Sequence, residues 1–274
     1  MPERPASPCT PPGPLANYRW IIINYSGGKD SQAALHHVIA ACDREGVPRE
    51  RLVVSHQCLG AMEWPGTVDL VREHARHYGL RVEITRYRDR SGHELNLLEY
   101  VRKRRRWPSS QQRYCTSEFK RGPGGRVIVK LHREAPGRVL NIYGFRSEES
   151  PARAAKTPFA LNKRFSSRTR EVWDWLPIHD WLESDVWRII GESPLRHHPA
   201  YTLGMPRLSC CFCIFAPRGA LIIAGRANPA LLDEYCAVEA EIQHTFQNGR
   251  GIAEIRAAIR SGEQPAAPNA VWNM

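Results

Sequence analysis

Six residues near the start of the chain, with the sequence SGGKDS, constrain its fold and its chemistry most. They are Ser26, Gly27, Gly28, Lys29, Asp30 and Ser31. An apolar, β-rich run at residues 20–25 precedes them, and apolar residues recur at helical spacing after them. The six residues are therefore predicted to form a turn from a strand into a helix. Unpaired backbone N–H groups and the helix dipole favour a polyphosphate at such a turn.

The residue types in this turn suit phosphate binding. Gly27 and Gly28 let the backbone close around an anion. Lys29 adds a positive charge, and the two serines add hydroxyl donors. Asp30 either holds Mg²⁺ or caps the helix. The Walker pattern GxxxxGK[ST] is absent, so this is not the common phosphate loop; the alternative is an ordinary glycine-rich turn.

Strand and helix patterns alternate along the chain and predict an α/β fold. Strands separated by helices of this length indicate βαβ units, and hence a doubly wound, mostly parallel sheet with its ligand site at the carboxyl ends of the strands. The expected strands are residues 20–25, 52–56, 82–85, 139–145 and 172–176. The expected helices are residues 31–44, 67–78, 94–104, 117–134, 183–190, 220–224 and 229–246.

Shifts in composition suggest four segments. A proline-rich start at residues 1–16 is typical of a flexible tail, and residues 17–200 carry the alternating α/β pattern. Residues 201–262 are predicted to form a small helical, cysteine-containing C-terminal appendage, and residues 263–274 a second tail. Residues 151–170 are polar and basic without periodicity, which predicts a mobile loop facing the substrate.

Charge and hydropathy narrow the choice of partners. The 274 residues carry a formal net charge of +11, which favours a polyanionic partner or substrate. The densest basic run, residues 102–106, precedes Trp107, a combination that suits phosphate neutralisation with base stacking. A solvated helix end is the alternative. No apolar run approaches the ~20 residues of a bilayer span, and no signal-peptide core is present, so a cytoplasmic protein without membrane contact is expected.

The cysteines form a second chemical signal. Eight cysteines without an export signal favour metal or redox chemistry over a disulfide framework. Cys210 and Cys213 have the C-x-x-C spacing of a chelating turn, and Cys115 and Cys236 are the candidates to complete a four-thiolate set. A [4Fe–4S] cluster and zinc both suit these ligands. Buried cysteines that act as small hydrophobic residues are the alternative.

A further segment closes the fourth expected strand. Gly144 allows close backbone approach to a ligand, and Arg146 suits a phosphate. Glu149 offers a carboxylate for ribose hydroxyls or for Mg²⁺. A charged surface loop without a ligand is the alternative.

Together these motifs resemble the phosphoadenosine phosphosulfate (PAPS) reductase family of the PP-loop ATP pyrophosphatase superfamily. The resemblance covers residues 19–246 approximately, and it includes SGGKDS, residues 62–67, the Tyr-Cys-Thr around Cys115, the segment from Gly144 and the C-x-x-C pair. It implies that residues 26–31 bind nucleotide phosphates, that Gly144 and Arg146 lie beside the nucleotide, and that Cys115, Cys210 and Cys213 occupy cluster positions.

Two departures from the family pattern shift the expected activity. The reductases use a cysteine near the C-terminus, whereas the last cysteine here is Cys236, and Cys115 stands alone where cluster-bearing reductases have a Cys-Cys pair. Cys58 occupies a position that is usually acidic, and its role stays open. The chain is more similar to the ATP pyrophosphatase of DNA phosphorothioation systems of the Dnd and Ssp types.

This resemblance implies an enzyme that converts ATP to AMP and pyrophosphate with Mg²⁺, with Lys29, Asp30 and Arg146 as catalytic residues. The expected acceptor is a nucleic-acid backbone phosphate, DNA rather than tRNA, with sulfur from a cysteine desulfurase. A homodimer is left open. The alternatives are a reductase of PAPS or adenylyl sulfate, a tRNA thiolase, and a non-catalytic nucleic-acid-binding subunit.

Overall fold

The structure is a computed structural model that describes residue 11 and residues 13–265. The chain forms two compact units. The first, here called the sheet unit, comprises Met1–His56, Val68–Thr85 and Gly124–His197. The second, here called the helical unit, comprises Gln57–Thr67, Arg86–Pro123 and His198–Met274. The predicted tails lie largely outside the described residues.

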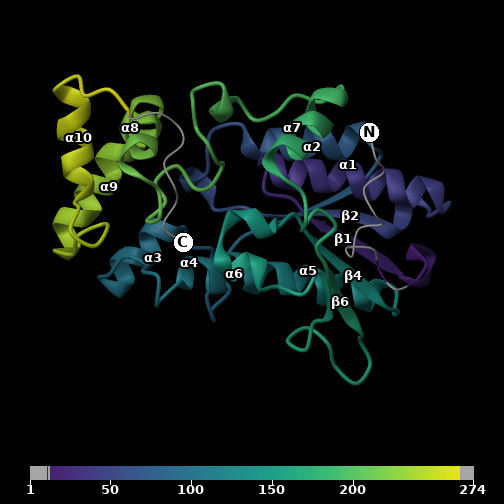
Figure 1. Cartoon of the computed structure of the whole chain (residues 1–274). Helices are drawn as coiled ribbons and strands as arrows, with labels where there is room; N and C mark the ends of the chain where they lie inside the picture. Colours follow the sequence, from purple (N-terminus) through teal and green to yellow (C-terminus); the bar gives the residue numbers. More distant parts are fainter. Residues whose placement is uncertain (1–10, 12, 266–274) are drawn as a thin grey trace. The chain divides into compact units, whose positions relative to one another are not determined.

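The sheet unit is built on six strands (Figure 1). They are β1 (Trp20–Asn24), β2 (Leu52–Gln57), β3 (Arg81–Thr85), β4 (Val139–Tyr143), β5 (Phe159–Leu161) and β6 (Val172–Trp175). Their order in the sheet is β3-β2-β1-β4-β6-β5. β1 pairs in parallel with β2 and β4, and β4 pairs in parallel with β6. The short β5 at the edge pairs antiparallel with β6.

Helices cover both faces of this sheet, as Figure 1 shows. They are α1 (Lys29–Arg44), α2 (Thr67–His77), α5 (Gly122–Glu134), α6 (Pro151–Ala154) and α7 (Glu183–Glu192). Ile21 and Ile23 of β1 pack with apolar residues of α1 and α2, whereas the alternate residues Trp20 and Ile22 pack with α5. Both sides of β1 are buried, as in parallel sheets covered by helices. The predicted doubly wound α/β fold is confirmed.

The helical unit holds the cysteine-containing C-terminal part of the chain. Its helices are α3 (Leu97–Arg104), α4 (Tyr114–Thr116), the π-helix Ser117–Arg121, α8 (Arg218–Ala227), α9 (Pro229–Ile242) and α10 (Ile252–Arg260). Its core joins residues that are far apart in sequence: Trp107 stacks on Tyr235 with ring centroids 5.3 Å apart, and Phe246 packs edge-on against Trp107. The helical, cysteine-containing part was predicted, but residues 57–67 and 86–123 also belong to this unit.

Two segments differ from the sequence-based expectation. Residues 151–170, predicted to be an irregular loop, contain α6 and β5. Phe159 of β5 stacks on Trp173 of β6 at 4.8 Å, which explains how so short a strand is held. Leu15 was assigned to the N-terminal tail, yet its side chain is buried and its N–H donates to Glu45 Oε2 at 2.6 Å.

No helix among the described residues is both long enough and apolar enough to span a bilayer.

Candidate functional site

The SGGKDS motif forms the turn between β1 and α1, as predicted. Gly27 has φ +78°, a left-handed conformation that favours glycine, and Gly28 caps the start of α1. Ser31 Oγ donates to the Gly28 carbonyl at 2.8 Å and accepts from the Ser26 N–H at 3.2 Å. The Ser31 hydroxyl therefore helps to hold the turn in shape, and its role as a phosphate donor stays a prediction.

Gly144 brings the segment after β4 against the start of α1. A Cβ atom at this position would lie 2.6 Å from the backbone carbonyl oxygen of Asp30 and 3.0 Å from Ser31 Cα. No side chain fits there, so only glycine allows the two backbones to approach so closely. The structure thus joins the two segments that the sequence singled out separately.

Arg146 is the second residue after Gly144, and its side chain is buried against carboxylates. Its Nε donates to Asp30 Oδ1 at 2.6 Å, and its Nη1 pairs with Glu148. Glu149 accepts from the Arg146 backbone N–H at 3.0 Å. Burial lowers the pKa of Arg146, but the charge of Asp30 and the hydrogen bonds to Asp30 and Glu148 outweigh it and raise the pKa. Arg146 therefore stays cationic.

Lys29 completes this group of charges. Its side chain is 3% exposed, and its Nζ lies 3.4 Å from Asp30 Oδ2 and 3.6 Å from Glu183 Oε1. Glu183 begins α7 and also lies 4.0 Å from Arg146. No pattern in the sequence pointed to Glu183, because it comes from a helix more than 150 positions after the loop. Two held cations thus face carboxylates at the carboxyl ends of the strands.

Some of the carboxylates around residues 26–31 suit a magnesium ion and others do not. Asp30 is engaged by Arg146 and Lys29, which leaves it little capacity as a metal ligand. Glu148 and Glu183 are about half exposed, at 47% and 50%. Mg²⁺ is usually held by one or two carboxylates together with substrate phosphates and water, a role that these two side chains suit.

Three of the four predicted cysteine ligands, all in the helical unit, influence one another's pKa values. Cys210 hydrogen bonds to Cys213, which raises the pKa of Cys210 and lowers that of Cys213. The charge of Lys120 favours both thiolates, and Cys115 interacts with the pair through its charge. Burial raises the pKa of Cys115 itself.

Among the described residues, the sulfur atoms of these three cysteines do not all lie within 4.8 Å of one another. Thiolates on one tetrahedral zinc ion lie roughly 3.8 Å apart, given Zn–S bonds of about 2.3 Å. Thiolates are also the usual ligands of iron–sulfur clusters, so the residue types at Cys115, Cys210 and Cys213 suit either group.

Cys236 has different surroundings. It is 6% exposed on α9, and burial raises the pKa of its thiol. The charges that act on this thiol come from Arg256 and Arg260 on α10 and from Glu239 and Asp233 on α9. The structure therefore does not bring Cys236 to the other three cysteines, consistent with its place on the apolar face of a helix.

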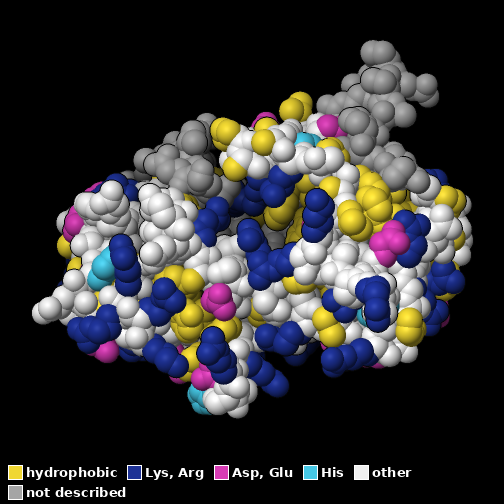
Figure 2. Space-filling model, turned by 90° about the horizontal axis from the view of Figure 1, so that it is seen from below, with side chains coloured by type: hydrophobic (Ala, Val, Ile, Leu, Met, Phe, Trp, Pro, Cys, Tyr) yellow, Lys and Arg dark blue, Asp and Glu magenta, His cyan; other side chains and the backbone are white. Residues whose placement is uncertain are grey.

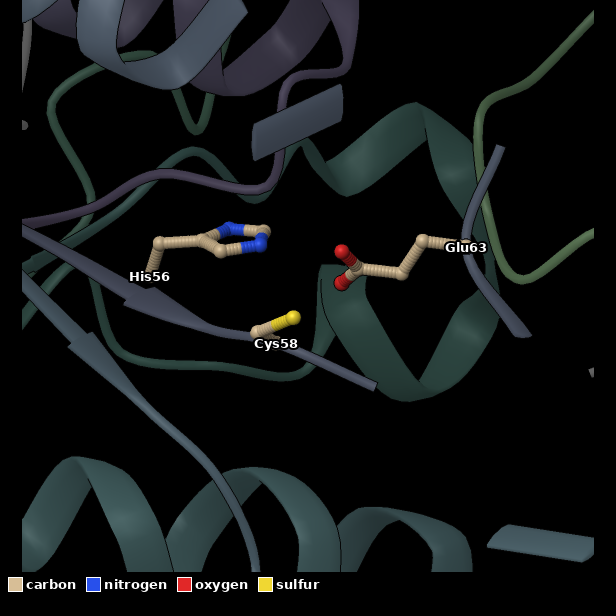
Figure 3. A group of neighbouring side chains, drawn as sticks. All are labelled: His56, Cys58 and Glu63. Carbon is tan, nitrogen blue, oxygen red and sulfur yellow. The ribbon is translucent and has the colours of Figure 1, made fainter. Parts of the chain in front are cut away.

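Cys58 lies in the segment from His56 to Glu63, which carries three potential metal ligands. Within the helical unit, Cys58 Sγ and a Glu63 carboxylate oxygen lie within 4.8 Å of each other, and the two side chains point toward one another in Figure 3. Cys58 is buried and also hydrogen bonds to Arg86, which raises the pKa of that arginine. Sequence reasoning noted Cys58 but missed its partners.

Basic side chains are spread over the surface shown in Figure 2. The run at residues 102–106 belongs to α3 and its C-terminus, where Arg102 pairs with Glu241 at 3.0 Å. Trp107, expected to stack on bases, is only 2% exposed and stacks on Tyr235 instead. The expectation for Trp107 is wrong, because the core of the helical unit takes this ring.

Residues 20–216 match the model of the phosphoadenosine phosphosulfate reductase domain. The chain is 30% identical over 116 residues to an uncharacterised 37.8 kDa protein of Escherichia phage 186, a match that covers 42% of this chain and 34% of the phage protein. It is 27% identical over 177 residues to the adenosine 5'-phosphosulfate reductase of Allochromatium vinosum, covering 62% of this chain and 61% of that enzyme. The chain thus spans less than two thirds of either relative.

A solved structure also resembles the chain. It is a phosphoadenylyl-sulfate reductase of Candida auris, with a TM-score of 0.43 and 17% identity over 69% of this chain and 80% of that one.

Proposed function

The chain belongs to the phosphoadenosine phosphosulfate reductase domain family, and from this premise we propose that it cleaves ATP between the α- and β-phosphates to activate a nucleic-acid backbone phosphate for sulfur insertion. One observation supports the proposal most: two buried cations, Lys29 and Arg146, both form ion pairs with Asp30 at the start of α1. There the helix N-terminus adds its own attraction for an anion.

In the proposed reaction the triphosphate lies over residues 26–31. Lys29 and Arg146 neutralise charge that develops on the phosphates, and Asp30 and Glu183 hold these two cations in position. A non-bridging oxygen of the acceptor phosphate attacks the α-phosphorus, the α–β anhydride bond breaks, and pyrophosphate leaves with the electron pair. Glu148 and Glu183 would bind Mg²⁺, which supplies additional charge neutralisation when bound.

The second step replaces oxygen with sulfur. A cysteine desulfurase delivers the sulfur as a persulfide, whose outer sulfur attacks the adenylylated acceptor phosphorus while AMP leaves with the oxygen. A thiol reductant then attacks the inner sulfur, so that the S–S bond breaks, the phosphorothioate is released and a disulfide is left. Cys115, Cys210 and Cys213 would hold a [4Fe–4S] cluster, which when bound supplies a carrier for sulfur or electrons. DNA is the proposed acceptor ahead of tRNA.

Lys29→Ala tests the first step. We expect a loss of pyrophosphate release of about 10²-fold or more, because a preorganised charge at the phosphates is removed. Lys130→Ala is the matched control, since Lys130 is an exposed lysine on α5 that pairs with Glu83, and we expect it to retain the rate. Release of ADP and orthophosphate, or unchanged kinetics in Lys29→Ala, would reject the assignment.

A sulfonucleotide reductase is the second candidate, favoured by the 27% identity to the Allochromatium vinosum enzyme. Such an enzyme would use the same loop for a different nucleotide. Incubation with adenylyl sulfate or PAPS and a thioredoxin, followed by an assay for sulfite, separates the two activities. Sulfite production without pyrophosphate release from ATP would favour the reductase.

The cluster assignment has its own test. We expect anaerobically purified protein to carry iron and sulfide and to lose both in Cys115→Ala, Cys210→Ala or Cys213→Ala. Cys236→Ala is the informative control and is expected to retain the metal, because this thiol lies among the charges of α9 and α10. Zinc in place of iron, or loss of metal in Cys236→Ala alone, would contradict the three-cysteine site.

A further inference from the structure

The helical unit contains a cavity that no part of the proposed reaction uses. Its volume is about 470 Å³, and it lies between the segment after β3 and helix α3. The residues that line it are mostly aromatic or charged: Tyr87, Tyr100, Arg90, Lys103, Arg104 and Asp89, together with Ser91. The volume falls within the ~300–1,000 Å³ range typical of small-molecule sites.

The aromatic wall of this cavity is held firmly from behind. Tyr87 stacks on Phe119 with ring centroids 4.6 Å apart, and Phe119 is 1% exposed. Tyr100 meets Tyr87 edge-on at 5.3 Å, and it also packs against Phe119. Both tyrosines are partly exposed. Rings fixed in this way offer an aromatic surface at little cost in conformational entropy.

Arg104 extends this surface. Its guanidinium lies 4.8 Å from the ring centre of Tyr114 and 5.7 Å from that of Tyr100. A guanidinium held over aromatic rings presents a flat, charged face, and nucleobases stack on such faces as they do on aromatic rings.

Charge at the cavity favours an anion. Arg90, Lys103 and Arg104 are exposed cations, and Asp89 is the one carboxylate among the lining residues. Asp89 Oδ1 already accepts from the Ser91 N–H at 2.9 Å and from the Ser91 hydroxyl at 2.6 Å. The charge of Lys103 also contributes to a pKa of Asp89 below its ordinary value, after the hydrogen bonds from Ser91 and His93. The Asp89 carboxylate thus stabilises the turn that contains Ser91. The net charge of the lining residues stays positive.

We propose that this cavity binds one nucleotide of a single-stranded nucleic acid, with the base against Tyr87, Tyr100 and the Arg104 guanidinium and the phosphate at Lys103 and Arg90. A fixed aromatic wall beside exposed cations is the combination that non-specific single-strand binding requires. A strand is favoured over a free nucleotide because α3 continues the positive charge past the cavity, through Lys103, Arg104, Arg105 and Arg106. The inference rests on the proposed function for the identity of the strand as substrate.

Fluorescence anisotropy of the full chain with a labelled 20-residue oligothymidylate tests this proposal. Tyr87→Leu keeps the bulk of the side chain but loses the ring, and we expect affinity to fall roughly 5- to 150-fold. Tyr87→Phe keeps the stacking surface and is expected to bind like the wild type. Thermal melting of both variants establishes that the fold is intact.

The cations are tested by salt dependence. Lys103→Ala should weaken binding and lower the slope of log K against log[salt] by about 1, as expected when one phosphate contact is lost. Arg188→Ala is the matched control, since Arg188 is an exposed arginine on α7 that pairs with Glu192 in the sheet unit. Equal losses in the two charge variants would overturn the proposal.

Two further measurements identify the source of the nucleotide. Thymidine monophosphate should compete only at far higher concentration than the strand, and a duplex should bind without sensitivity to Tyr87→Leu. Tight monophosphate binding without strand binding would overturn the proposal. Strand binding that depends on Tyr87 in a protein that releases no pyrophosphate would uphold the cavity and reject the proposed function instead.

Discussion

At the scale of single residues, Gly144 allows the segment after β4 to pack against the SGGKDS turn. The backbone after β4 passes so close to the start of α1 that a Cβ atom would meet the Asp30 carbonyl oxygen at 2.6 Å. The contact is with backbone on a buried helix end, so the strain cannot be relieved by rotation of a side chain.

Gly144→Ala is therefore expected to destabilise the protein by about 1–3 kcal/mol and to weaken ATP binding, since Arg146 moves with this segment. Thermal unfolding with and without ATP measures both effects. Gly191→Ala is the control: a Cβ at Gly191 on α7 meets nothing within 4 Å, and a gain of about 0.5–1 kcal/mol is expected there. An unchanged melting temperature in Gly144→Ala would contradict the close approach.

The site residues were predictable to different degrees. Lys29 and Arg146 lie in two sequence motifs, SGGKDS and the segment from Gly144, whose residue types indicate phosphate binding. The fold brings these two motifs together. Ser31 was predicted to bind the ligand, and the structure adds a bond from its hydroxyl to the turn's own backbone, which the sequence did not indicate. Glu183 could not be found from the sequence, because nothing local marks a carboxylate that arrives from another helix.

At the scale of helices and strands, α1 and α2 each carry a histidine whose pKa burial lowers. His36 of α1 contacts the Tyr78 hydroxyl, and His74 of α2 lies 2.5 Å from the Tyr25 hydroxyl through Nδ1. Burial lowers the pKa of each histidine to about 4, and the charges of His74 and His77 lower the pKa of His36 further.

These histidines predict a loss of stability in acid. Because the unfolded chain binds protons near pH 6.5 and the folded chain only near pH 4, stability is complete above pH 6.5 and falls as the pH drops from 6.5 to 4. The slope is at most about 1.4 kcal/mol per pH unit for each histidine, less for the half-exposed His36.

Urea unfolding across this range measures the slope. His74→Gln should flatten the curve, whereas His93→Gln, at an exposed position, should leave the curve unchanged. A profile that is level between pH 6.5 and pH 4 would show that the two helices tolerate the charged imidazoles.

Strand positions followed from the sequence because each parallel strand is buried on both faces and forms an apolar run. The short β5 and α6 did not, since elements of three and four residues give no periodicity, and β5 is held by its pairing with β6. The same holds for Trp107, whose partner Tyr235 is 128 positions away in the chain.

At the scale of the whole molecule, the helical unit is assembled from three separate segments. Leu98, Trp107 and Phe119 come from the middle of the chain, and they share one core with Phe212 and Tyr235. The boundary at residue 200 expected from composition therefore divides a core in two, because hydrophobic contacts between distant segments leave no mark on local composition.

A chain shortened to residues 1–200 is expected to aggregate or to bind hydrophobic dyes, because it lacks Tyr235 and Phe246 and so exposes Trp107. Thermal unfolding followed by circular dichroism, with the full chain as control, checks this expectation. A soluble fragment with the full chain's cooperativity would mean that residues 86–123 pack without the C-terminal helices.

Lys29 and Arg146 already have carboxylate partners before any ligand arrives. An orthophosphate or sulfate ion that displaces one carboxylate exchanges one pairing for another and gains little. A polyphosphate can replace several of these ion pairs at once, while the translational and rotational entropy of binding is lost only once. In the proposed reaction, the preoccupied cations would thereby discriminate among anions by the number of connected charges, so that abundant simple anions would not saturate the loop.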